Sequence, residues 1–70
     1  MQETNAYRIK IRGQVDENEL NAMTPLKMEV VRVEAAATLV TICTDQSGLI
    51  GLLRHLHGRG FVLLAVTCES

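Results

Sequence analysis

The sequence is poor in aromatic side chains: it has no tryptophan, one tyrosine and one phenylalanine among 70 residues. Surfaces that bind single-stranded nucleic acid stack bases on aromatic rings placed among basic groups. With only Tyr7 and Phe61 available, the basic stripe of Arg8, Lys10 and Arg12 does not predict such a surface. The net charge of −1 also provides no overall attraction to nucleic acid or to an anionic membrane.

Cysteine is also scarce, since Cys43 and Cys68 are the only two and stand far apart. They form no Cys-x-x-Cys pair and no framework of four or more, which excludes a zinc ribbon or a secreted disulfide scaffold. We expect both to be reduced and in or near the core. No apolar run reaches the ~18 residues of a membrane span, and the first residues do not resemble a signal peptide, so the sequence predicts a cytoplasmic protein.

Catalytic and metal-binding patterns are missing as well. The sequence has no nucleophile and base at a recognisable spacing and no glycine-rich phosphate loop, while Asp16, Glu17 and Glu19 are typical of a solvated helix start. His55 and His57 are two residues apart, so on a helix they diverge by about 200° and cannot chelate one ion. We therefore expect no enzyme activity, no cofactor and no metal.

What the sequence does have is aliphatic residues, which bring its hydrophobic content to 47%. That content predicts one globular domain, over residues 7–70, behind a disordered tail of residues 1–6. A chain this short buries only roughly 60% of its unfolded surface, so its stability is marginal. Small folds of this kind often depend on self-association.

Hydrophobic periodicity predicts the order of elements. Alternation over residues 7–15 indicates a strand, residues 16–23 allow one or two helical turns before Thr24-Pro25, and residues 26–34 and 38–44 have strand composition. Apolar residues then recur at helical spacing from Leu49 to Leu56, Gly58 or Gly60 can end that helix, and residues 61–66 form a last strand. This order predicts an α+β, ferredoxin-like plait: a four-stranded antiparallel sheet, order 4-1-3-2, with one main helix and a vestigial first helix.

One helix covers one face of a sheet, so the other face becomes the candidate interaction surface. We expect the helix to cover Tyr7, Ile9, Ile11, Leu26, Met28, Leu39, Thr41, Phe61, Leu63 and Ala65. The reverse face would then carry Val31, Val33, Val40, Ile42, Val62, Leu64 and Val66, interrupted by the basic stripe of the first strand. Apolar patches of this size predict a protein interface, most simply a homodimer. The alternative is a bulge near Val30-Val31 that turns some valines inward and leaves a monomer.

A second candidate site is the start of the main helix, at Asp45, Gln46, Ser47 and Gly48. Asp45 or Ser47 can cap the helix, and the same unpaired amides could receive a carboxylate or phosphate. The stretch TDQSGLIGLLRHLHGRGFVLL resembles the loop, helix and strand of ACT-type regulatory domains, with Gly48 at the family glycine and Ser47 where the family has proline. That resemblance implies a small effector, such as an amino acid, bound at this turn between subunits.

Over its full length the chain resembles a group of short bacterial ferredoxin-like proteins with Y-x-I-x-I-x-G, then D-Q and a leucine-rich helix, then G-x-x-L-L-x-V. That group implies a fold and no activity. The sequence thus predicts a non-enzymatic binding or regulatory module that self-associates through its sheet. The alternatives are a small subunit that docks on a different protein and an ACT-like effector sensor.

Overall fold

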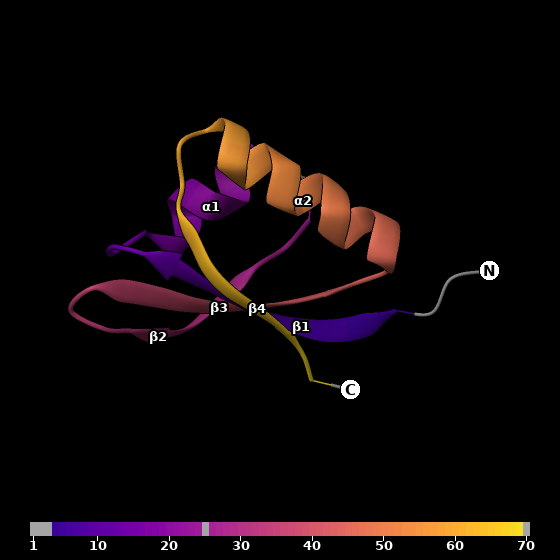
Figure 1. Cartoon of the computed structure of the whole chain (residues 1–70), viewed down its shortest axis with the longest axis horizontal. Coiled ribbons are helices and arrows are strands. Elements are labelled where there is room, and N and C mark those ends of the chain that lie inside the picture. Colours follow the sequence, from indigo (N-terminus) through magenta and orange to yellow (C-terminus); the bar gives the residue numbers. More distant parts are fainter. Residues whose placement is uncertain (1–3, 25, 70) are drawn as a thin grey trace.

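The computed structural model describes residues 4–24 and 26–69 and contains six elements. In chain order these are β1 (Asn5–Arg12), α1 (Glu17–Met23), β2 (Glu29–Val33), β3 (Ala37–Thr44), α2 (Gln46–Gly58) and β4 (Leu63–Cys68) (Figure 1). β1 begins at Asn5, so the predicted tail is wrong for its last two residues, and residues 1–3 lie outside the described part. The chain is a small α+β domain.

The four strands form one antiparallel sheet in the order β2-β3-β1-β4, which reads 4-1-3-2 from the β4 edge. β1 is central, with β3 on one side and β4 on the other. Both helices lie over the same side of this sheet (Figure 1). The opposite side, called the reverse face below, carries no helix, and β2 and β4 are the two edges.

The core lies between the helices and the sheet. α2 contributes the buried Leu49, Leu52 and Leu56, in the predicted stripe, and α1 contributes Leu20, which is fully buried. The strands supply the other large buried side chains: Tyr7, Ile9, Ile11, Val40 and Ile42, with Met28 from the segment before β2. Full burial of such a side chain contributes ~1.5–3 kcal/mol. The short first helix therefore contributes a buried side chain to the core.

Two loop features set how the strands meet the helices. Gly60, two residues past α2, has φ +93°, a left-handed conformation that turns the chain back into β4. Thr38 of β3 is buried, donates its hydroxyl to the Gly13 carbonyl at 2.7 Å and accepts the Val15 N–H at 2.9 Å. These bonds fix the segment between β1 and α1 against β3.

Candidate functional site

β3 turns toward the helices two side chains that were predicted for the reverse face. Val40 stands opposite Ile9 of β1 and Ile42 stands opposite Tyr7. Directly opposite residues of an antiparallel pair share a face. Val40 and Ile42 are accordingly 0% and 2% exposed, so their assignment to an interface is wrong. In the run TLVTICT both alternating sets can be buried, so its periodicity does not indicate which set faces the core.

The same shift puts Leu39, Thr41 and Cys43 on the reverse face. Leu39 is opposite Lys10 and Thr41 is opposite Arg8, and both were predicted to face the helix. Cys43 and Cys68 are both exposed and are not joined to each other, so the prediction of core or near-core positions is wrong for them. The reverse face therefore combines a leucine, a threonine and a cysteine of β3 with the basic side chains of β1.

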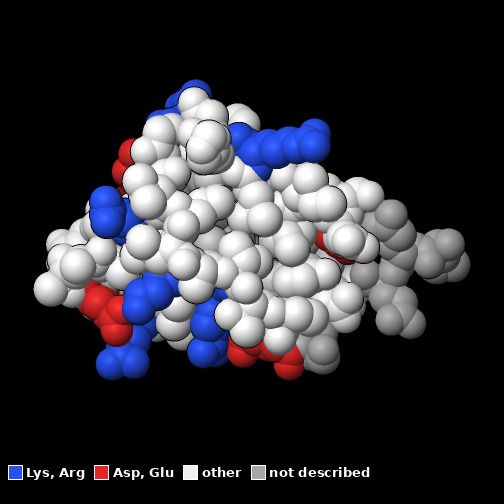
Figure 2. Space-filling view, viewed as in Figure 1, with Lys and Arg blue, Asp and Glu red and all other residues white. Residues whose placement is uncertain are grey.

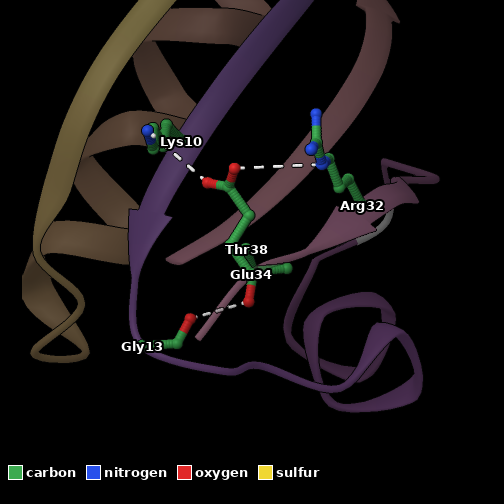
Figure 3. Close-up of polar contacts among 5 residues, drawn as sticks. All are labelled: Lys10, Gly13, Arg32, Glu34 and Thr38. Atoms are coloured by element: carbon green, nitrogen blue, oxygen red, sulfur yellow. Dashed lines mark hydrogen bonds and ion pairs between the residues drawn. The ribbon is translucent and has the colours of Figure 1, made fainter. Parts of the chain in front are cut away.

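Ion pairs across the strands make the reverse face polar. Lys10 Nζ lies 3.6 Å from one carboxylate oxygen of Glu34 and Arg32 Nε lies 3.8 Å from the other (Figure 3). Arg8 Nη2 lies 3.1 Å from Glu69 Oε2. Exposed pairs like these contribute roughly 0–1 kcal/mol each, so their main effect is to offset the charges of Arg8 and Lys10 in the basic stripe. The predicted aliphatic reverse face is therefore wrong.

The apolar side chains left exposed lie instead along the two edges of the sheet and on α2. Among the described residues the large ones are 42–52% exposed: Val31 and Val33 in β2, Val62, Leu64 and Val66 in or beside β4, and Ile50 on α2. Figure 2 shows an uncharged surface across the middle of the molecule, where β4 runs below α2, with charged side chains around its border. Sequence reasoning missed Ile50 because it adjoins the buried stripe of α2 without belonging to it.

Side chains of α1 cover the β2 edge. The Asn21 side chain accepts the Met28 N–H at 2.7 Å and donates to the Met28 carbonyl at 3.0 Å. Glu17 Oε2 accepts the Val30 N–H at 3.0 Å. Backbone groups that a neighbouring strand could use are thus already bonded on residues 28–30. Covering an edge in this way is a known protection against strand pairing.

The β2 strand itself adds further protection. Glu29 and Arg32 make two of its five residues charged. Its register against β3 shifts between Val30 and Arg32, so the bulge near Val30-Val31 named in the alternative is present, but Val31 and Val33 remain about half exposed and do not turn inward. A bulge twists an edge strand, and charges on it oppose pairing with another strand. The β2 edge is therefore a poor docking strand despite its exposed valines.

The β4 edge lacks these devices. No charged residue occurs from residue 60 to residue 68. The Glu69 N–H donates to the Ala6 carbonyl at 2.8 Å, and bonded and non-bonded pairs alternate along an antiparallel ladder. Val66, opposite Ile9, therefore directs its N–H and C=O away from β1. The register shift leaves Leu64 without a partner on β1, and beyond it the Val62 carbonyl accepts the Arg12 N–H at 2.9 Å, so the outward direction of the backbone follows for Val66 and not for Leu64.

At the start of α2, two of the predicted ligand residues, Asp45 and Gly48, have a structural role. Asp45 is the N-cap, and its Oδ1 accepts the Gly48 N–H at 2.7 Å, as expected for capping. A side chain at Gly48 would overlap the Thr44 hydroxyl, so that position requires glycine. Gln46 and Ser47 are exposed in the first turn of α2. Nothing about these four residues tests the prediction of a ligand.

A shallow hollow of about 290 Å³ lies beside that turn. Gly48, Gly51 and His55 line it from α2, and Met23 and Leu26 line it from the opposite wall. In the described ranges, no three His, Cys, Asp or Glu side chains gather in a way that could hold a metal ion. Over the same ranges, neither helix has the length and apolar content needed to cross a bilayer.

Comparison with known proteins gives one family. A family model described as a domain of unknown function, DUF8691, matches residues 6–67, which is nearly the whole chain. No curated protein and no solved structure matches. No ACT-type family and no ferredoxin-like family matches, so these comparisons give no support to the two resemblances seen in the sequence.

Proposed function

The chain belongs to the DUF8691 family of domains of unknown function, and we propose that it is a small, non-enzymatic binding and regulatory module that self-associates through the edge of its sheet. The observation that carries this proposal is the exposed, uncharged β4 strand with an outward-facing backbone. The polar reverse face does not serve as the interface, in contrast to the expectation from sequence. A cytoplasmic location is part of the same proposal and rests on the sequence.

A ferredoxin-like topology is the finer form of the fold in this proposal. It is supported by the element order β-α-β-β-α-β and by the central position of β1 between β3 and β4. In this arrangement the last strand is an edge with one bare side. The topology alone implies no activity, since one fold supports many functions. The functional claim therefore depends on the edge strand.

We expect the assembly to be weak. Leu64 and Val66 are each a little under half exposed, and full burial of such a side chain contributes ~1.5–3 kcal/mol. Two partly exposed side chains from each copy offset only part of an association cost of roughly 4–15 kcal/mol, and strand hydrogen bonds supply the rest. A dissociation constant in the micromolar range or above follows.

Sedimentation velocity over a wide concentration range tests self-association. We expect a rise from the monomer mass of 7.7 kDa toward twice that value as the concentration reaches high micromolar. A strict monomer over the whole range would contradict the proposal. If the monomer binds a different folded protein through the same strand, the alternative of a small docking subunit takes its place.

The hollow beside α2 supports a second candidate function, binding of a small effector. It contains Gly48, from the turn predicted as a ligand site, together with the imidazole of His55. A ligand that binds only the folded state raises the melting temperature by mass action. Thermal denaturation with amino acids and with nucleotides tests this candidate. A stabilising ligand whose effect is lost in His55→Ala would support it, and no shift with any of them would contradict it.

A further inference from the structure

We draw no further inference here: the strongest candidate, the exposed apolar strip of Val62, Leu64 and Val66 along the β4 edge, belongs to the surface on which the proposed self-association already rests, and nothing in the described part of the structure shows what covers it.

Discussion

The two edges of this sheet are built differently. β2 is five residues long, carries two charges and a register shift, and has Glu17 and Asn21 of α1 bonded to the backbone of residues 28–30. β4 is six residues long, carries no charge, and leaves Leu64 and Val66 exposed, with the backbone of Val66 directed outward. One edge is protected against pairing and the other is open to it.

This difference explains a short helix that otherwise buries little. α1 spans only seven residues, and Leu20 is its one buried residue, yet its polar side chains bond the segment that leads into β2. A chain with two open edges would pair at both and extend without closing. A chain with one open edge can close as a dimer. In the self-association that we propose, the helix would thus contribute specificity of assembly as well as core packing.

The largest expected effect comes from proline substitutions in β4, at a residue whose backbone faces β1 and at one whose backbone faces away from it. Thr67 and Arg8 form one of the hydrogen-bonded pairs between β4 and β1. Thr67→Pro therefore removes a hydrogen bond within the sheet and leaves the Arg8 carbonyl without its partner. We expect the free energy of unfolding to fall by about 3 kcal/mol or more, measured by urea denaturation. Val66→Pro removes only an outward N–H. It should keep the fold and abolish dimerisation, and equal destabilisation by both prolines would contradict the assigned phase.

The next effect concerns the cover over β2. Asn21→Ala leaves the Met28 N–H and carbonyl without their side-chain partner in a half-buried position, which should cost about 1–3 kcal/mol. A domain of this size then melts roughly 4–8 °C lower for each kcal/mol lost. Asn18→Ala on the same helix is the matched control, because Asn18 is exposed. Similar melting temperatures for the two variants would show that Asn21 does not hold β2.

The smallest expected effect concerns Glu17, whose carboxylate accepts the Val30 N–H of β2. Glu17→Gln keeps an acceptor for the Val30 N–H but removes its charge, so we expect a loss of about 0.5–1 kcal/mol. Glu19→Gln is the control, since Glu19 occupies the same first turn and has the same helix-dipole contribution. Thermal melts in low and high salt measure both. A larger loss for Glu19→Gln would mean that the helix dipole dominates.

Much of the fold could be predicted from the sequence, because its periodic segments are distinct. Alternation in β1 and the leucine spacing of α2 were read correctly, and Asp45 caps α2 as expected. The face of β3 could not be predicted, since Leu39, Val40 and Ile42 are all apolar and burial depends on pairing with β1. The charged stripe of β1 was the available signal: residues opposite Arg8 and Lys10 had to share its solvated face.

The candidate site was predicted in part for the same reason. Val62, Leu64 and Val66 were identified as exposed apolar residues, but the reverse face was expected to carry them, whereas they lie along the β4 edge. Hydropathy shows that a residue lacks a polar group and does not show which strand ends a sheet. The contacts of Glu17 and Asn21 with β2 left no periodic signal either, because they are polar contacts between neighbouring elements.

Residue-resolved amide hydrogen exchange, measured by NMR at low and at high protein concentration, tests the central claim most directly. The Val66 amide points outward, so it should exchange rapidly in the dilute monomer and gain protection as the concentration rises. The Thr67 amide, bonded within the sheet, should stay protected throughout, and the β2 amides should not change. Protection that grows at β2 while Val66 exchanges at one constant rate would contradict the account.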